Sequence, residues 1–250
     1  MGEVLVLDGV WKAFDRGRNQ ISVLEGVSLT VGAAEIVAVV GTRDQGKTTL
    51  LRVASGSLRV DRGSVRLCDR ELTGLSDGQL ARVLRTEIGW AARSGPEVRV
   101  RVRDYVELPL ATGRWLGWRE RRLRVDKALT RLDVAGAAEL RWGELSDWQR
   151  ALVELVQAVV GRPRVLLVDD VIDGLGLGKK QAAMEIVRGF ANELGCGVLI
   201  AVSDHAAALP ADRVWQLSGG RLKLMADLTD PDVIPLHKGR DGGRGWMTGS

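Results

Sequence analysis

The sequence has few of the features that mark secreted, disulfide-rich or membrane-spanning proteins. It contains two cysteines in 250 residues, Cys68 and Cys196, and we expect both to be small buried side chains in a reducing compartment. No apolar run reaches the roughly 18 residues that a spanning helix needs. The first residues lack the basic start and apolar stretch of a secretory signal, and they lack a myristoylation site. These absences predict a cytosolic protein.

Strong charge of one sign is also missing. The formal net charge is +4, and the one basic run is VRVRVRD at residues 98–104. Its alternation predicts a strand-like segment with the arginines on one face. Because neither interleaved aromatic residues nor a nucleic-acid reading module accompanies this run, we expect a solvated face and no nucleic-acid partner. Anionic lipid headgroups and an acidic partner loop stay open as alternative ligands of the run.

What the sequence does contain is an alternation of apolar strands and amphipathic helices. The runs typical of buried parallel strands are EIVAVVG at 35–41, RVLLVDD at 164–170 and GVLIAVSDH at 197–205. Helical spacing lies between them, so we predict one α/β domain over residues 1–228. Its core covers 1–92 and 161–228, and a helical subdomain covers 93–160. The remaining residues, 229–250, are rich in glycine, proline and charge, and we expect a mobile tail.

Residues 41–48, GTRDQGKT, match the phosphate-loop pattern G-x-x-x-x-G-K-[ST]. In such a loop the backbone N–H groups and a helix N-terminus face the phosphates, Lys47 reaches the β and γ phosphates, and the Thr48 hydroxyl holds Mg²⁺. Asp169, at the end of a second buried strand, is placed to hold the same ion; the alternative is a carboxylate that only caps its loop. The pattern predicts ATP and Mg²⁺ as cofactors of a P-loop NTPase core. The predicted nucleotide-binding residues of the loop are Gly41, Thr42, Arg43, Asp44, Gln45, Gly46, Lys47, Thr48 and Thr49.

Three further segments carry a resemblance to a known family. They are VWKAF at 10–14, LSDWQRALVELVQ at 145–157 and VLLVDDVIDGL at 165–175. With them the chain resembles, over nearly its whole length, the ATP-binding subunit of an ABC transporter. The segments LTGLSD and DYVELPL are most similar to the macrolide-exporter, lipoprotein-release and cell-division branch.

This resemblance implies a particular fold, particular partners and a particular place in the cell. The fold is a RecA-like core with an inserted helical subdomain, with Phe14 stacked on adenine and Ser146 at the phosphate of a paired subunit. The partners are a second ATP-binding subunit, identical or different, and an integral membrane permease bound through the helical subdomain and the Arg93 loop. The chain would then lie on the cytoplasmic face of the cell membrane.

Several positions depart from the family pattern near the phosphates. Asp44 stands where the family has glycine; aspartate tolerates left-handed backbone, but its charge weakens phosphate binding by repulsion. Arg93 replaces a glutamine that touches Mg²⁺ and the attacking water. A guanidinium cannot ligate a cation, although it can neutralise Asp44 or a phosphate.

The residues that resemble catalytic groups also differ. Asp170 stands at the position of the general-base glutamate and is one methylene shorter, which retracts the carboxylate by about 1.5 Å. Asp204 stands at the position of the switch histidine, and His205 follows it. Because adjacent strand residues point to opposite faces, His205 would face away unless the strand bulges; a solvent-facing histidine is the alternative.

The dimer-contacting motif has lost its small residues. Ser146 is kept, but Asp147 and Trp148 replace two glycines, and a side chain there hinders close approach to an anionic phosphate. Gly176 stands where the family has an aspartate. These departures predict a degenerate subunit, weak or inactive in hydrolysis, that acts beside a competent ATPase. A slow but genuine ATPase and a soluble scaffold outside transport are the alternatives.

The segment GRWLGWRE places Trp115 and Trp118 three residues apart. On a helix these residues share a face. We expect that face either to pack in the core or to contact the permease.

Overall fold

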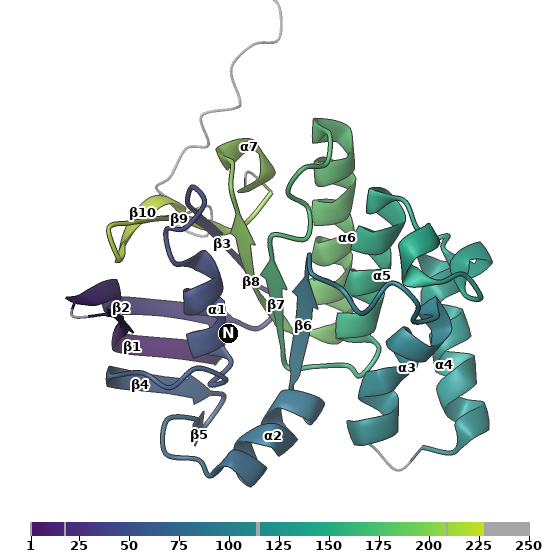
Figure 1. Ribbon diagram of the computed structural model, residues 1–250, viewed down its shortest axis with the longest axis horizontal. Coiled ribbons are helices and arrows are strands. Elements are labelled where there is room, and N and C mark those ends of the chain that lie inside the picture. The colour runs from purple at the N-terminus through teal and green to yellow at the C-terminus, as the bar shows by residue number, and fades with distance from the viewer. Residues whose placement is uncertain (1, 18, 114–115, 209, 228–250) are drawn as a thin grey trace, which may run out of the picture.

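A computed structural model describes residues 2–17, 19–113, 116–208 and 210–227 of the chain. Its centre is a six-stranded sheet in the order β10-β9-β3-β8-β7-β6 (Figure 1). The strands from β9 to β6 run parallel, and β10 at the edge runs antiparallel. Their bounds are β3 (Ile36–Val40), β6 (Ile88–Ala92), β7 (Val165–Asp169), β8 (Gly197–Val202), β9 (Arg213–Ser218) and β10 (Arg221–Asp227).

The central strands form because their residues are apolar on both faces. All residues of β3, β7 and β8 are buried, as expected for a parallel sheet covered on both sides. Along β3 the side chains alternate, so Ile36 and Ala38 join one hydrophobic cluster while Val37 joins the other. The first cluster is closed by α5 (Asp147–Val159) and α6 (Leu177–Leu194). The predicted α/β core is confirmed.

A second, antiparallel sheet covers the other face. Its order is β2-β1-β4-β5, and α1 (Lys47–Ala54) contacts strands of both sheets. The strands are β1 (Glu3–Arg16), β2 (Asn19–Gly32), β4 (Arg62–Leu67) and β5 (Arg70–Glu71). Cys68, in the turn after β4, has a φ of 50° and is only half-buried, so the expected burial holds for Cys196 alone.

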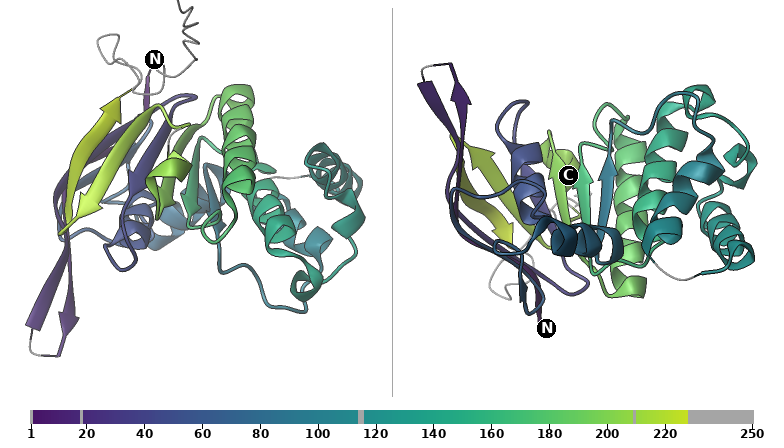
Figure 2. Two further views of the ribbon diagram at one scale, coloured as in Figure 1. Left: turned by 90° about the horizontal axis from the view of Figure 1, so that it is seen from above. Right: turned by 60° about the horizontal axis from the view of Figure 1, so that its bottom comes forward.

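The inserted region is helical, and it lies at the opposite end of the molecule from the antiparallel sheet (Figure 2). Helix α5 joins it to the core, because Leu155 packs in the sheet cluster and Val153 in a third, helical cluster. The remaining helices are α2 (Asp77–Thr86), α3 (Val102–Gly113), α4 (Trp118–Arg131), α7 (His205–Ala208) and the short 3-10 turns Ala135–Ala137 and Trp142–Glu144.

One sequence prediction about this region is wrong, and another is answered for Trp118 only. The run at 98–104 is not strand-like, because α3 begins at Val102 and buries Val102, Val106 and Leu110 at four-residue spacing. Trp118 is the first residue of α4, after an extended Gly117. This residue is 63% exposed, which rules out the core alternative for Trp118. Trp115 itself and the tail at 229–250 lie outside the described residues.

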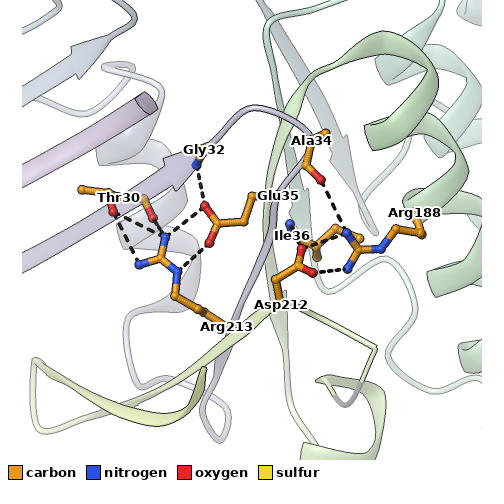
Figure 3. Close-up of polar contacts among 8 residues, drawn as sticks. All are labelled: Thr30, Gly32, Ala34, Glu35, Ile36, Arg188, Asp212 and Arg213. Atoms are coloured by element: carbon orange, nitrogen blue, oxygen red, sulfur yellow. Dashed lines mark hydrogen bonds and ion pairs between the residues drawn. The ribbon is translucent and has the colours of Figure 1, made fainter. Parts of the chain in front are cut away.

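A network of charged side chains fixes the amino-terminal ends of β3 and β9 (Figure 3). Arg213 donates two hydrogen bonds to Glu35, of 2.5 and 3.0 Å, and these bonds raise the pKa of its guanidinium. Arg188 on α6 pairs with both carboxylate oxygens of Asp212 at 2.8 and 2.9 Å, and Asp212 also accepts from the Ile36 N–H. The carboxyl ends of the same strands, where ligands bind in open α/β sheets, lie opposite this network.

Candidate nucleotide-binding site

The phosphate loop joins β3 to α1 and needs glycine at two positions. Gly46, the residue before α1, has a φ of 95°, and a Cβ there would lie 2.7 Å from Val23 Cγ1. A Cβ on Gly41 would lie 3.0 Å from the Leu217 carbonyl oxygen. Asp44 adopts the left-handed region at a φ of 64°, so the loop forms in spite of the missing glycine. Its neighbours Thr42 and Arg43 are exposed.

Lys47 is folded over this loop. It is 5% exposed, and its ammonium group donates to the carbonyl oxygens of Gly41 at 2.8 Å and Thr42 at 3.3 Å. It also donates to Ser203 Oγ at 3.3 Å and lies 3.6 Å from Asp170 Oδ1. The ammonium charge therefore sits where the loop converges, as a phosphate-binding lysine requires. Next in the chain, Gln45 anchors the loop by accepting from the Gly219 N–H at 3.3 Å.

The two predicted metal ligands are brought together. Thr48 at the start of α1 donates from Oγ1 to Asp169 Oδ1 at 3.0 Å. Burial raises the pKa of Asp169, while this hydrogen bond and Lys47 oppose the rise. A hydroxyl and a carboxylate at this spacing are hard oxygen donors suited to Mg²⁺. The residues present therefore fit the ion. Thr49, which follows, is half-buried.

Asp170 lies next to these ligands with a strained backbone, at a φ of 53°. Burial, followed by the nearby Asp173 carboxylate, raises the pKa of Asp170 to about 6. Its Oδ1 atom is buried and accepts no hydrogen bond from the described residues. Asp173 was missed by sequence reasoning; it accepts hydrogen bonds from the Ser203 N–H, at 3.3 Å, and from the Ser203 hydroxyl. The spacing of three between the two acids was the signal that could have found it.

Arg93 stands apart from the phosphate loop. Its N–H donates to the Asp169 carbonyl oxygen at 3.2 Å, while its guanidinium lies over Gly174, where a Cβ would be 3.3 Å from a terminal nitrogen. Among the described residues no ion pair joins it to Asp44, whereas the alternative, an Arg93–phosphate pair, stays a prediction. Arg93 instead lines a cavity of about 150 Å³ together with Asp173 and Glu154.

The Asp204 and His205 side chains are engaged elsewhere or exposed. Asp204 pairs with Lys180 on α6 and accepts from the Ala207 N–H at 2.8 Å, so it caps α7. The Lys180 hydrogen bond lowers the pKa of Asp204. Strand β8 ends at Val202, and His205 is the exposed first residue of α7.

Ser146 begins α5, and the residues after it point in different directions. Ser146 and Gln149 form a capping box, in which Ser146 Oγ accepts from the Gln149 N–H at 3.3 Å. The Asp147 side chain is 83% exposed. Trp148 is half-buried and packs against both the sheet cluster and the helical cluster, so part of its indole is covered by this chain's own core. Gly176 is the N-terminal capping residue just before α6 and has an extended conformation.

Phe14 lies on the strand pair that borders the phosphate loop. It pairs across the sheet with Ile21, two residues before the Val23 that packs on Gly46. The ring is 41% exposed, and the Lys12 ammonium lies 5.6 Å from its centre. An exposed ring face beside a phosphate site can stack on a purine base.

A glycine-dependent loop, a buried lysine and a threonine–aspartate pair at the carboxyl ends of parallel strands define a P-loop nucleotide-binding protein. A sequence model described as ABC transporter matches residues 24–173. The chain is 33% identical over 227 residues to the lipoprotein-releasing system ATP-binding protein LolD of Cereibacter sphaeroides, across 89% of this chain and 100% of the relative. The chain belongs to the ABC transporter family.

Other similar proteins agree with this membership. The macrolide export ATP-binding/permease protein MacB of Chromobacterium violaceum is 30% identical over 222 residues, across 88% of this chain and 34% of that protein. The dimeric ATP-binding cassette MJ0796, in a post-hydrolysis state with ADP and Pi, superimposes with a TM-score of 0.83 at 23% identity, covering 90% of this chain and 98% of that one. At that identity the structural likeness shows the fold alone.

Within the part of the chain that the structure describes, no helix is both long and apolar enough to cross a bilayer. The chain spans about a third of the macrolide export protein.

Proposed function

We propose that the chain binds ATP with Mg²⁺ as a subunit of an ABC transporter complex and is defective in hydrolysis. The observation that carries this proposal is the contrast between the two halves of the site. The groups that hold phosphate and metal, Lys47 and the Thr48–Asp169 pair, lie together. Asp170, the group that would activate water, is short and lies beside the Lys47 ammonium.

Binding is assigned to the residues around the phosphate loop. The loop N–H groups and Lys47 would hold the phosphates, Phe14 would stack on the base, and Thr48 with Asp169 would hold Mg²⁺. When bound, the ion neutralises charge on the phosphates. Because Lys47 already faces the loop, it would exchange its present partners, the two loop carbonyl oxygens and the Ser203 hydroxyl, for phosphate oxygens.

Weak hydrolysis is assigned to Asp170. A general base must be deprotonated and within hydrogen-bond reach of the attacking water. Asp170 is shorter than glutamate by about 1.5 Å. Its pKa of about 6 leaves it mainly deprotonated at neutral pH, so the shorter reach alone carries the proposed defect. A slow but genuine ATPase is the second candidate, because the metal-holding pair is intact.

The partners are assigned from the surface. A groove of about 350 Å³ separates α2 from α3 and α5, and its lining includes Trp90, Leu108 and Pro109. We assign this groove to a loop of a membrane permease, because it is mainly apolar and the permease is what the relatives' names imply as partner. The exposed Asp147 carboxylate would repel the phosphate of a second ATP-binding subunit, so we pair this chain with a competent one. Such a complex lies on the cytoplasmic face of the membrane. A soluble scaffold outside transport is the remaining alternative.

The test is the variant Asp170→Glu, which restores the missing methylene. We expect ATP binding to be unchanged and phosphate release to rise by at least about tenfold, a small part of what a general base contributes. Lys47→Ala is the control, because it should abolish binding and hydrolysis together. Wild-type turnover above about 1 s⁻¹, the usual lower range for enzymes, with no gain in Asp170→Glu would refute the defect in hydrolysis.

A further inference from the structure

The first two turns of α4 carry large apolar side chains in the solvent. Trp118 is 63% exposed and Leu123 is 53% exposed. Arg119 and Arg122 lie on the same exposed stretch, and the Arg119 guanidinium lies 5.4 Å from the centre of the Trp118 ring. We name these four residues the α4 patch. Trp118 and Leu123 are five residues apart and lie on either side of the two arginines around the helix. Large apolar side chains exposed within two turns of one helix suggest an interaction site.

Positive charge surrounds these apolar groups. Of the fourteen residues of α4, six are basic and two are acidic. Glu107 and Glu120 neutralise Arg121 and Arg124, which face partly inward. Arg122 and Lys127 form no ion pair with any side chain in the described ranges, and Lys127 lies one turn beyond the patch. The exposed side of α4 is therefore positive as well as apolar.

From this combination we propose that the α4 patch contacts the surface of an anionic lipid bilayer. Tryptophan favours the membrane–water interface, because its ring is apolar and its N–H is polar. Arginine and lysine bind the acidic headgroups beside it. The patch lies outside the groove and the cavity described above, whose linings contain no α4 residue. A basic helix end that carries an exposed tryptophan and lines neither of these hollows fits a flat acidic surface.

The position of the α4 patch is consistent with a contact to the lipid bilayer. The beginning of α4 lies at the same end of the molecule as α2 and the carboxyl end of α3 (Figure 1), and these two elements border the groove assigned to the permease. A chain docked through that groove would hold the patch toward the bilayer. This placement rests on the proposed function, whereas the charge and exposure of the patch do not.

The experiment is sedimentation of the purified full chain with lipid vesicles, without permease or nucleotide. We expect binding to vesicles of equal parts phosphatidylglycerol and phosphatidylethanolamine, and little binding to phosphatidylcholine alone. Each basic side chain near an acidic surface strengthens binding by about fivefold. The double variant Arg119→Glu with Arg122→Glu should therefore bind at least about 25-fold more weakly, and Trp118→Ala with Leu123→Ala should bind on the order of tenfold more weakly.

Matched controls separate the patch from total charge and total apolar surface. Arg62→Glu with Arg66→Glu changes the same charge on β4, and Leu224→Ala with Met225→Ala removes exposed apolar groups on β10; both should bind like the wild type. Equal binding to neutral and acidic vesicles, or equal losses in the α4 and control variants, would overturn the proposal. If the α4 variants keep vesicle binding but lose the permease in co-purification, a protein loop is the occupant and the lipid proposal is wrong. ATP binding tests the proposed function separately.

Discussion

Glu154 offers a test of the electrostatics behind the site, because it is a carboxyl group buried without a cation. It is 3% exposed on α5, and its oxygens accept from the Tyr105 hydroxyl at 3.0 and 3.1 Å. Oε2 also accepts from the N–H of Ala92, at 3.4 Å, the residue before Arg93. No basic side chain among the described residues forms an ion pair with it. Burial raises the pKa of Glu154 to about 7, although both kinds of hydrogen bond oppose the rise.

The raised pKa of Glu154 makes the stability of the protein depend on pH. The pKa is 4.5 in the unfolded chain and about 7 in the folded one, so folding favours the protonated form. The protonated Glu154 carboxyl therefore favours the folded state. This contribution to the free energy of unfolding is fully present below about pH 4.5, and it is lost as the pH rises through about 7. At about 1.4 kcal/mol per pH unit, the gap between the two values corresponds to about 3 kcal/mol.

Glu154→Gln keeps the shape of the side chain and removes the charge. We expect the free energy of unfolding to exceed that of the wild type by about 2–3 kcal/mol at about pH 8 and to match it within about 1 kcal/mol at about pH 5. Urea unfolding at both values measures this difference. In Tyr105→Phe the Glu154 carboxylate loses a hydrogen-bond donor. The free energy of unfolding should therefore fall more steeply with rising pH than it does in the wild type. Asp170 also has a raised pKa, of about 6, which lies between the two pH values. The variant Asp170→Asn therefore serves as the control for the titration of that carboxyl group.

Two outcomes would refute this reasoning. One is a wild-type stability that does not fall between the two pH values. The other is a Glu154→Gln variant whose stability falls as steeply as that of the wild type.

Two further changes test the loop and the groove. Gly46→Ala places a Cβ 2.7 Å from Val23 Cγ1 on a left-handed backbone, so we expect the free energy of unfolding, measured by thermal unfolding, to fall by about 2–4 kcal/mol. Adding Val23→Ala should recover only the part of this loss that is due to the steric clash. Full recovery would show that the left-handed backbone causes no strain. Leu108→Glu puts a charge into the groove, so permease co-purification should fall by at least about tenfold with ATP binding unchanged. Leu224→Glu on β10 is the matched control, and a complex that survives Leu108→Glu would exclude the groove.

The buried strands and the phosphate loop could be predicted because their signal is local. An apolar run such as residues 36–40 is readable in one dimension, and so is a glycine followed by Lys47 and Thr48. The antiparallel sheet could not be predicted, because it pairs β1 with β4 across 51 to 62 residues, from Trp11 with Arg62 to Leu5 with Leu67. The start of α3 was misread because an alternation of valine and arginine satisfies the strand period over a few residues. Only the burial of Val106 and Leu110 settles the helical period.

In the nucleotide-binding site, too, contacts between residues distant in the sequence could not be predicted. Asp169 and Asp170 are adjacent in the sequence, but the contact partners of the other side chains around the site come from distant elements. Asp204 turned out to be tied to α6, Asp173 to the end of β8, and Trp148 to the two hydrophobic clusters. None of these contacts follows a spacing rule, so none could be predicted.

These local partners also bear on which departure matters most for hydrolysis. The Asp204–Lys180 and Asp147–Arg150 pairs have carboxylates that are 42% and 83% exposed, and exposed pairs of this kind contribute at most about 1 kcal/mol each. A bound nucleotide or a paired subunit could break them at small cost, so they do not lock the site. The reach of Asp170 is different, because no rearrangement of neighbours lengthens a side chain. If Asp170→Glu restores hydrolysis while Asp204→His and Asp147→Gly change it by less than about fivefold, the defect lies in the missing methylene. If the order is reversed, the defect lies in closure of the dimer.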